Sequence, residues 1–217
     1  MWPFRKSKTL KVRDLLAGFT DWHSHILPGV DDGVPTLEET LAVLHCYEAL
    51  GVAEVWCTPH IMEDIPNTTA ALRDAFAQLC AAYTGPLRLH LGAEHMLDNL
   101  FEERFAREDV LPLGAGRLLV ETSYFNPPMG LYHTLERIKS RGYTPVLAHP
   151  ERYLYMGPDD YRRLKAAGVA FQLNLPSLLG LYGRHIREKA EWLNDRGFCD
   201  YLGSDLHDRR MIQHFLE

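Results

Sequence analysis

The sequence predicts a single α/β domain of parallel strands joined by helices, and three observations support this prediction. The chain has 217 residues, which is the size of one domain. Strand-like and helix-like segments alternate along it, and strands that alternate with helices imply parallel crossovers. No Pro-, Ser- or Gly-rich linker interrupts the alternation. Periodicity alone does not separate a closed barrel from an open doubly wound sheet.

The predicted strands are short runs rich in apolar and β-branched residues, most of them bounded by glycine or by polar residues. Each is too short to form a helix by itself, and each lies one helix-like segment away from the next. In chain order they cover residues 19–23, 53–58, 87–91, 117–121, 144–148, 169–173 and 201–203.

The predicted helices have apolar residues at helical spacing and recognisable ends. In the first, Thr36 is a plausible N-cap with Glu39 three residues on, which is the spacing of a capping box. Gly51 then ends that helix. Glycines follow several of the others in the same way. In chain order the helices cover residues 36–50, 68–83, 99–107, 131–140, 159–167 and 183–196.

The composition excludes several classes of protein. Hydrophobic residues make up 46% of the chain and charged residues 24%, an ordinary balance for a soluble globular domain. Its apolar runs are far shorter than the roughly 18 residues that suggest a membrane span. A net charge of -6 argues against a nucleic-acid-binding surface. The four cysteines show no CxxC spacing, and we see no signal peptide, so we expect free thiols and a cytoplasmic protein.

The N-terminus differs from the rest of the chain in charge. Its first 13 residues carry five basic side chains and no acidic one. We interpret residues 1–18 as a basic arm and residues 19–217 as the domain. The arm could contact anionic lipid or an acidic partner, or it could be a solvated tail. Pairing between the arm and the acidic body of another copy would give a homo-oligomer.

Side chains that bind metals follow nearly every predicted strand. In parallel α/β folds the carboxyl ends of the strands share one face, where active sites are built. Six of the seven predicted strands place a His, Asp or Glu there, and the remaining strand is followed by Asn174. With one aspartate from the segment after the first strand, the candidate metal ligands are His23, His25, Asp32, His60, Glu94, Glu121, His149, Asp205 and His207.

These ligand types indicate a polynuclear metal site. Imidazole and carboxylate together suit Mn, Fe and Zn. A His-x-His or Asp-x-His pair on extended chain presents both side chains on the same side. A single ion cannot use nine ligands, whereas two or three ions can. We therefore predict two to three divalent ions, with Mn or Fe favoured and Zn as a further candidate.

Each motif taken alone has a structural alternative. A single His-x-His pair also occurs by chance, and Glu121 could be a buried, hydrogen-bonded acid. It is the joint placement at the strand ends that points to metal binding. The other histidines are interpreted as surface, helix or packing residues; they are His45, His90, His95, His133, His185 and His214.

The order of the motifs resembles a known family. His-Ser-His is followed along the chain by Thr-Pro-His, Gly-Ala-Glu, Ala-His-Pro-Glu-Arg and Ser-Asp-Leu-His, as in the polymerase-and-histidinol-phosphatase (PHP) superfamily of metal-dependent phosphoesterases. Residues 23–33 resemble more specifically the protein-tyrosine phosphatases of bacterial capsule and exopolysaccharide operons, of the CpsB/YwqE type. The resemblance spans residues 21–207. It implies a distorted (β/α)7 barrel with its active site at the carboxyl ends of the strands.

The resemblance also implies how the ligands divide between three metals. It assigns Asp32 rather than Asp31, because Asp32 directly precedes Gly33. It makes Glu94 a bridge between the first and second metals. The three implied sets are His23, His25, Glu94 and Asp205; Glu94, Glu121 and His149; and Asp32, His60 and His207.

Arginines complete the implied site. A guanidinium offers fork-like contacts to phosphate oxygens. Arg152, three residues after His149, matches the phosphate-binding arginine of the family, although an ion pair with Glu151 is the structural alternative. The family has another arginine beyond the last Asp-x-His, and Arg209 and Arg210 are the candidates here, at a spacing that departs from the pattern.

The activity implied by the resemblance is hydrolysis of phosphotyrosine on the tail of a bacterial tyrosine kinase that regulates capsular or exopolysaccharide synthesis and export. Short loops after most strands favour it, because an open site admits a protein-borne phosphotyrosine. Two alternatives stay open, a small-molecule phosphoesterase such as a histidinol-phosphatase and a non-catalytic metal-binding barrel. The chain has no CxxxxxR phosphate loop, so the cysteines are not candidate nucleophiles. We also expect a short or truncated final helix, since the sequence ends at Glu217.

Overall fold

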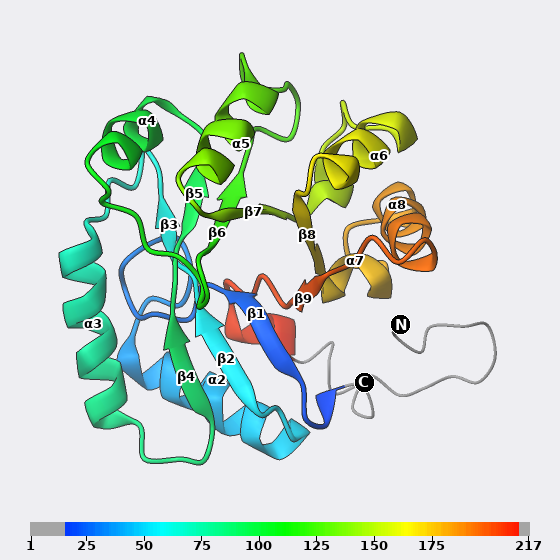
Figure 1. The fold of residues 1–217 in the computed structure, drawn as a ribbon. Helices are drawn as coiled ribbons and strands as arrows, with labels where there is room; N and C mark the ends of the chain where they lie inside the picture. Colours follow the sequence, from blue (N-terminus) through cyan, green and yellow to red (C-terminus); the bar gives the residue numbers. More distant parts are fainter. Residues whose placement is uncertain (1–15, 213–217) are drawn as a thin grey trace.

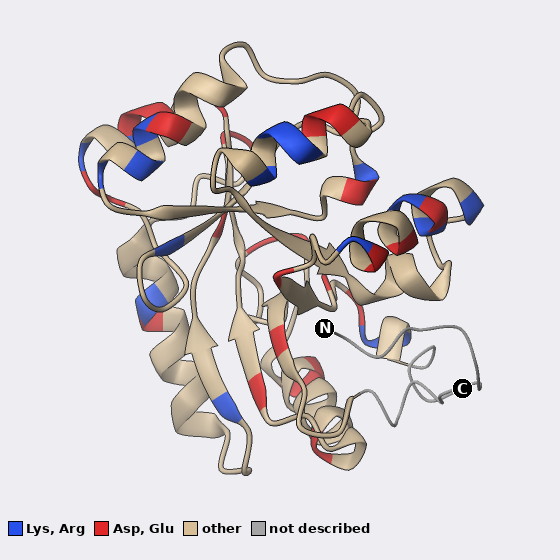
Figure 2. Cartoon of the chain, turned by 45° about the vertical axis from the view of Figure 1, so that its right-hand side comes forward, with Lys and Arg blue, Asp and Glu red and all other residues tan. Residues whose placement is uncertain are grey.

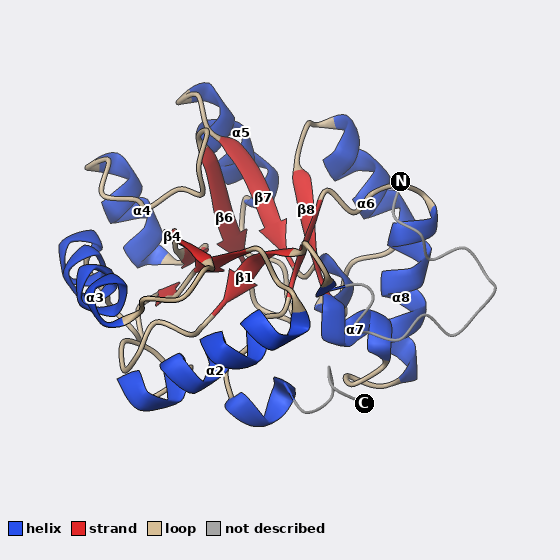
Figure 3. Cartoon of the chain, turned by 90° about the horizontal axis from the view of Figure 1, so that it is seen from below, coloured by secondary structure: helices blue, strands red, loops and turns tan. Residues whose placement is uncertain are grey.

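In the computed structural model, which describes residues 16–212, nine parallel strands are surrounded by helices (Figure 1). Seen from below, the strands occupy the middle and the helices the outside (Figure 3). The prediction of one α/β domain with parallel crossovers is therefore confirmed. The elements are β1 (Thr20–Ser24), α2 (Leu37–Leu50), β2 (Glu54–Cys57), β3 (His60–Ile61), α3 (Thr69–Ala82), β4 (Arg88–Leu91), β5 (Glu94–Met96), α4 (Asn99–Ala106), β6 (Arg117–Glu121), α5 (Leu131–Ser140), β7 (Thr144–Ala148), η1 (Pro150–Arg152), α6 (Pro158–Ala166), β8 (Ala170–Asn174), α7 (Leu175–Leu179), α8 (Arg184–Asp195), β9 (Tyr201–Gly203) and η2 (Arg209–Ile212).

The strands form two hydrogen-bonded ladders, β1-β2-β4 and β3-β5-β6-β7-β8-β9. The chain itself joins the ladders, because β3 follows β2 closely and β5 follows β4. At the other end, a bridge between Ser24 and Leu206 links the segments of β1 and β9, and the Asp205 N–H donates to the His23 carbonyl at 2.8 Å. The result is a curled parallel sheet, and these pairings do not confirm a fully closed (β/α)7 barrel.

Local sequence signals fix several element ends. The Thr36 hydroxyl accepts a hydrogen bond from the Glu39 N–H at 3.2 Å, which caps α2 as predicted. Gly51 ends the same helix in the left-handed conformation, with φ of 78°. The helices beyond α2 also end within a residue or two of their predicted positions.

Two short strands in the structure are absent from the prediction. The predicted runs 53–58 and 87–91 form β2 and β4, and β3 and β5 follow them. His60 and Glu94 therefore begin strands of their own rather than lying in the loops after a strand. Pro59 separates β2 from β3, since it has no N–H to donate to a ladder. The short helix α7 and the turns η1 and η2 were not predicted.

Apolar side chains fill two separate clusters. The main core lies where the helices pack against the strands and includes Val43, Leu44 and Tyr47 of α2. A smaller cluster gathers around Trp56 and contains residues of β1, β2, β6, β7, β8 and β9. Most of the charged segments lie on the outer helices (Figure 2).

The packed part of the chain begins no later than Leu16, which is buried in the main core. Residues 1–15 and 213–217 lie outside the described residues, and with them most of the predicted basic arm, His214 and the end of the predicted last helix. None of the described helices is long and apolar enough to cross a membrane.

Candidate metal centre

The structure brings all nine predicted ligand residues together at the carboxyl ends of the strands. Their ligand atoms fall into three overlapping groups, in each of which the atoms lie within 4.8 Å of one another. Asp205 and His149 border these groups through ion-pair distances. The groups are His23, His25 and Glu94; His60, Glu94 and Glu121; and His25, Asp32, His60 and His207.

The first group is the most deeply buried part of the site. The Nε2 atoms of His23 and His25 lie 3.0 Å apart. Oε2 of Glu94 lies 3.2 Å from the first of these nitrogens and 3.3 Å from the second. Oδ1 of Asp205 lies 3.6 Å and 3.4 Å from the same two nitrogens. Two ring nitrogens and two carboxylate oxygens thus surround one point, and they are a donor set that suits Zn, Fe or Mn.

Two side chains that sequence reasoning missed orient these rings. Gln172 Oε1 lies 2.7 Å from His23 Nδ1, and Asp31 Oδ2 lies 2.8 Å from His25 Nδ1. Amide and carboxylate oxygens only accept hydrogen bonds, so each Nδ1 carries a proton and each Nε2 is the ring atom turned toward the other. A proton or a metal ion between the two Nε2 atoms would account for their short separation.

The second group contains buried polar atoms without hydrogen-bond partners. His60 Nδ1 lies 3.2 Å from Glu94 Oε2 and 3.0 Å from Glu121 Oε1, yet all three atoms are buried and none makes a hydrogen bond. His149 Nε2 lies 2.9 Å from Glu94 Oε1 and 3.9 Å from Glu121 Oε2. Buried polar atoms are almost always paired, and a divalent cation would satisfy these.

The third group opens to solvent. Oδ1 of Asp32 lies 3.6 Å from the Nε2 atoms of both His60 and His207, and the Asp32 side chain is 63% exposed. His60 faces two ways, with Nδ1 toward Glu121 and Nε2 toward Asp32. Asp31, by contrast, is turned inward and accepts hydrogen bonds from His25, Gly33 and His60.

The electrostatics of the site favour a bound cation. Burial disfavours a charged imidazole, but the carboxylates of Glu94 and Asp205 raise the pKa of His23 to about 9. Burial would raise the pKa of Glu94, yet His23 and His60 hold it well below its ordinary value. For Asp205, His23 and His25 overcome the same effect of burial and hold the pKa low. These ionised carboxylates attract positive charge, which a proton or a metal ion can supply.

The backbone around the site is strained or crowded in places that the sequence did not mark. His149 and Asp205 have positive φ angles, 31° and 50°, which non-glycine residues rarely adopt. A Cβ at Gly33 would lie 2.0 Å from the His25 carbonyl oxygen, and one at Gly203 would lie 2.5 Å from His23 Cβ. Only glycine fits these two close approaches, which hold the His-x-His segment in place.

Arg152 approaches the centre from η1. Its Nη1 donates to Asp205 Oδ2 at 2.8 Å, and Asn174 Nδ2 donates to the same oxygen at 2.7 Å. The guanidinium lies over two aromatic rings, 4.4 Å from the centroid of Tyr124 and 4.7 Å from that of Tyr182. The sequence pattern pointed to Arg152, but it gave no signal for either tyrosine, because both lie in loops.

The sequence matches the family described as "Capsular polysaccharide synthesis, CpsB/CapC" over residues 19–213. The chain belongs to this CpsB/CapC family. The resemblance to the CpsB/YwqE phosphatases is thereby confirmed.

Individual relatives of this CpsB/CapC protein carry consistent names. Tyrosine-protein phosphatase YwqE of Bacillus subtilis is 27% identical over 195 residues, covering 87% of this chain and 77% of its own length. Tyrosine-protein phosphatase CpsB of Streptococcus pneumoniae is 28% identical over 202 residues, with coverage of 87% and 82%. A solved structure from work on YwqE and CpsB, described there as unique metal-dependent tyrosine phosphatases, matches with a TM-score of 0.81 at 26% identity and covers 92% of this chain and 86% of that one.

Two predicted site residues of the CpsB/CapC chain are not joined to the cluster. Arg210 is exposed and pairs with Asp208, its Nε lying 2.8 Å from Oδ2. Arg209 is also exposed. Within residues 16–212, no hydrogen bond or ion pair connects either arginine to the nine ligand residues.

His95, although adjacent to Glu94, points away from the centre. Its Nδ1 lies 3.1 Å from the Leu119 carbonyl oxygen, and its Nε2 accepts a hydrogen bond from the Leu111 N–H at 3.3 Å. Burial lowers the pKa of His95 to about 4, so the ring is neutral. This is the packing role expected for it from the sequence.

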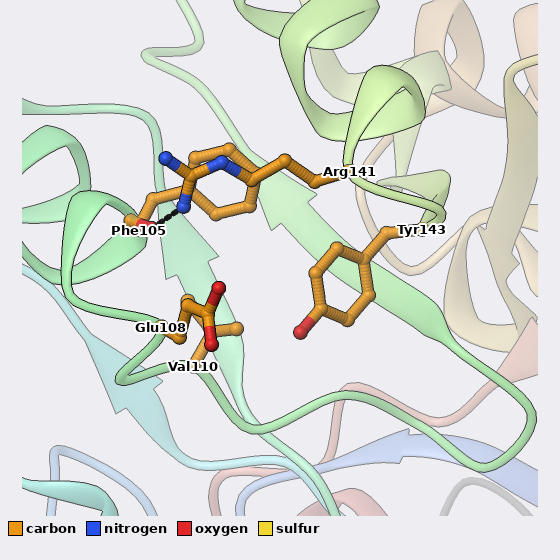
Figure 4. Close-up of a pocket in the computed structure, with 5 residues that line it drawn as sticks. All are labelled: Phe105, Glu108, Val110, Arg141 and Tyr143. Atoms are coloured by element: carbon orange, nitrogen blue, oxygen red, sulfur yellow. Dashed lines mark hydrogen bonds between the residues drawn. The ribbon is translucent and has the colours of Figure 1, made fainter.

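A large hollow elsewhere on the CpsB/CapC protein is not part of the centre. It measures about 550 Å³ and is lined by Phe105, Glu108, Val110, Arg141 and Tyr143 (Figure 4). The last two residues precede β7, whereas His149 follows that strand. The hollow therefore lies toward the amino end of β7, away from the metal ligands.

Proposed function

We propose that this chain is a metal-dependent protein-tyrosine phosphatase that hydrolyses phosphotyrosine on the tail of a kinase regulating capsular or exopolysaccharide synthesis and export. The observation that carries the proposal is the convergence of nine His, Asp and Glu side chains with buried, unpartnered ligand atoms. The names of the relatives support the reaction, and the family description supports its place in capsule synthesis.

The donor set fits two to three divalent ions, for which Mn and Fe are the first candidates and Zn the next. We assign one ion to His23, His25, Glu94 and Asp205, a second to Glu94, Glu121 and His149, and a third to Asp32, His60 and His207. Ions bound there would activate a water molecule and neutralise the phosphoryl oxygens. His60 lies close enough to Glu121 to contribute to the second ion as well.

The chain's own residues position the substrate. Arg152 presents a guanidinium fork to the phosphate, and the rings of Tyr124 and Tyr182 limit its rotation. Asp205 would share one oxygen with Arg152 and leave the other for metal. Arg209 and Arg210 remain candidates for a second phosphate contact. A tyrosine phenolate is a good leaving group, so a strong general acid is not required.

We further propose that the strands form the distorted (β/α)7 barrel of the family. The bridge between Ser24 and Leu206 and the shared interior cluster around Trp56 support it. Because a kinase tail is phosphorylated with ATP inside the cell, we place the protein in the cytoplasm. Association into a homo-oligomer and the lack of nucleic-acid partners remain predictions.

The test is an assay of purified protein with Mn²⁺, offered a phosphotyrosine peptide and histidinol phosphate side by side. We expect turnover of the peptide and its loss when a chelator removes the metal. Turnover of histidinol phosphate alone would instead indicate a small-molecule phosphoesterase. No metal-dependent turnover of either would indicate a non-catalytic barrel, and fewer than two bound ions per chain would contradict the polynuclear centre.

A further inference from the structure

Most of the exposed large apolar side chains belong to segments that follow three neighbouring strands. Within the described residues, five large hydrophobic side chains are exposed, and four of them lie in the segments that follow β6, β7 and β8. We call these four residues the apolar rim. They are Phe125 (68% exposed), Met129 (102%), Leu154 (55%) and Leu181 (40%).

The loops that carry the rim have no formal charge. No Asp, Glu, Lys or Arg occurs in residues 122–135, 153–158 or 174–183, although charged residues make up 24% of the whole chain. The segment after β1, by contrast, contains Asp31 and Asp32. Charged side chains of neighbouring helices do approach these segments, since Arg163 Cζ lies 3.8 Å from the Tyr132 ring centroid and Lys189 Nζ donates to the Tyr153 carbonyl. The exposed rim side chains themselves are apolar, and an apolar rim bordering a site for a dianionic phosphate recognises something other than the phosphate itself.

Each of three rim residues is next in sequence to a ring that packs on the catalytic groups. Phe125 follows Tyr124 and Leu181 precedes Tyr182, the two rings that flank Arg152. Leu154 follows Tyr153, whose ring centroid lies 5.8 Å from that of His149.

A hydrogen bond ties two of the loops together, since the Leu154 N–H donates to the Tyr124 carbonyl at 2.8 Å. The parts of the rim at Phe125 and Leu154 are therefore held in fixed relation to each other and to Tyr124.

A hollow of about 380 Å³ adjoins the rim. It lies between Pro127 and Pro128 of the segment after β6 and Tyr155 and Met156 of the segment after β7, and Asp160 of α6 also lines it. Its volume is within the range of about 300 to 1,000 Å³ that is usual for ligand pockets. A side chain next to a phosphotyrosine could enter this hollow while the phosphate stays at the metals.

We propose that the apolar rim binds the polypeptide on either side of the phosphotyrosine and selects substrates with apolar or aromatic residues there. This inference rests on the proposed function, because it takes the phosphate to be bound at the metal centre. The phosphotyrosine ring lies beside Tyr124 and Tyr182, and its neighbours contact Phe125, Leu154 and Leu181. Acidic neighbours find no Lys or Arg within residues 122–135, 153–158 or 174–183 to pair with. Arg152, which precedes Tyr153, is already paired with Asp205.

The experiment compares three substrates of the manganese-loaded protein. They are a phosphotyrosine peptide flanked by Leu and Phe, the same peptide flanked by Glu, and p-nitrophenyl phosphate, which has no flanking residues. For the wild type we expect kcat/KM for the apolar peptide to exceed that for the acidic peptide by about tenfold or more. Binding of non-hydrolysable phosphonate versions of both peptides should show the same order.

The matched variants are Phe125→Ser, Leu154→Ser and Leu181→Ser, with Leu37→Ser as control. Leu37 is as exposed as Leu181, at 40%, but begins α2 and does not follow β6, β7 or β8. Each rim variant should lower the ratio of kcat/KM for the apolar peptide to kcat/KM for p-nitrophenyl phosphate by about three- to tenfold, chiefly by raising KM for the peptide. The control should keep that ratio.

Two results would overturn the inference, and they are distinguishable. In the first, the wild type hydrolyses phosphotyrosine peptides, but the rim variants show the same ratio of kcat/KM between the apolar and the acidic peptide as the wild type. The rim then has no role in substrate selection, while the proposed function stands. If wild type hydrolyses no phosphotyrosine substrate, the proposed function fails and the inference fails with it.

Discussion

Within the curled sheet, the carboxyl ends of the strands and the aromatic cluster around Trp56 gather different kinds of side chain. The carboxyl ends carry histidines and carboxylates, several of whose buried atoms have no hydrogen-bond partner. In the aromatic cluster, which lies within the strands, Trp56 is stacked between Trp22 and His90, with ring centroids 5.6 Å and 4.7 Å away. Arg117 covers this aromatic cluster, its Cζ lying 4.9 Å from the Trp22 centroid.

The difference indicates that one set of side chains stabilises the fold and the other binds metal. Stacked rings and aliphatic side chains stabilise the fold by burying apolar surface. The carboxyl ends of the strands gather like-charged carboxylates and buried polar atoms without partners, which cost stability until a cation binds. Mutations at the metal centre should therefore affect mainly activity, and mutations in the aromatic cluster mainly stability.

The largest effect is expected for His149→Ala at the metal centre. It should lower kcat for a phosphotyrosine peptide on the order of 10³-fold, because one metal ligand is lost. The variant should stay folded, with a fall in the free energy of unfolding of about 1–3 kcal/mol, because the buried contact between His149 Nε2 and Glu94 Oε1 is lost. Steady-state kinetics and urea unfolding measure the two quantities. An unfolded variant would show that His149 is structural.

In the aromatic cluster, Trp56→Ala should destabilise the fold by about 3–5 kcal/mol, because it leaves a cavity between Trp22 and His90. Urea unfolding of the metal-free protein measures this loss. The fraction that remains folded should keep its activity per folded molecule. A loss of kcat without a loss of stability would contradict the division between the metal centre and the aromatic cluster.

Arg152→Ala should lower kcat by about 10²-fold with the fold intact, since it removes the phosphate fork. Arg152→Lys should recover little, because an ammonium cannot make the bidentate contact or stack in the same way between Tyr124 and Tyr182. Arg209→Ala serves as the exposed control and should have a much smaller effect. Equal losses in the two alanine variants would favour a second phosphate contact at Arg209.

Asp31→Asn tests a residue that orients the metal ligand His25 but is not itself assigned as a metal ligand. The His25 Nδ1 lies 2.8 Å from Asp31, and weakening such a partner typically lowers metal affinity by about 10- to 100-fold. Metal content after dialysis against a series of buffered Mn²⁺ concentrations measures the change. The exposed Asp64→Asn variant is the control. Unchanged affinity in Asp31→Asn would assign Asp31 a purely structural role.

The smallest effect is expected from thiol alkylation. Burial raises the pKa of the Cys57 and Cys199 thiols, the latter to about 12. At pH 7.5 iodoacetamide should therefore label the exposed Cys80 first and leave kcat unchanged. Mass spectrometry identifies the labelled sites. Inactivation that follows labelling of Cys57 would contradict a metal-dependent mechanism without a cysteine nucleophile.

The sequence by itself determined the α/β class, most helix ends and the identity of the nine clustered residues. These features are local or periodic. A cap such as Thr36 acts within one turn, and parallel strands necessarily share their carboxyl edge, so a residue such as His149 or Asp205 is assigned to that edge by its place after a strand.

The tertiary structure alone decided how these residues are held. Gln172 and Asp31 set which ring nitrogens of His23 and His25 face the centre, and Tyr124 and Tyr182 enclose Arg152. Such contacts join distant segments, and they depend on sheet curvature and loop conformation. The side-chain period along one strand encodes neither, because it specifies only which side of that strand a residue occupies.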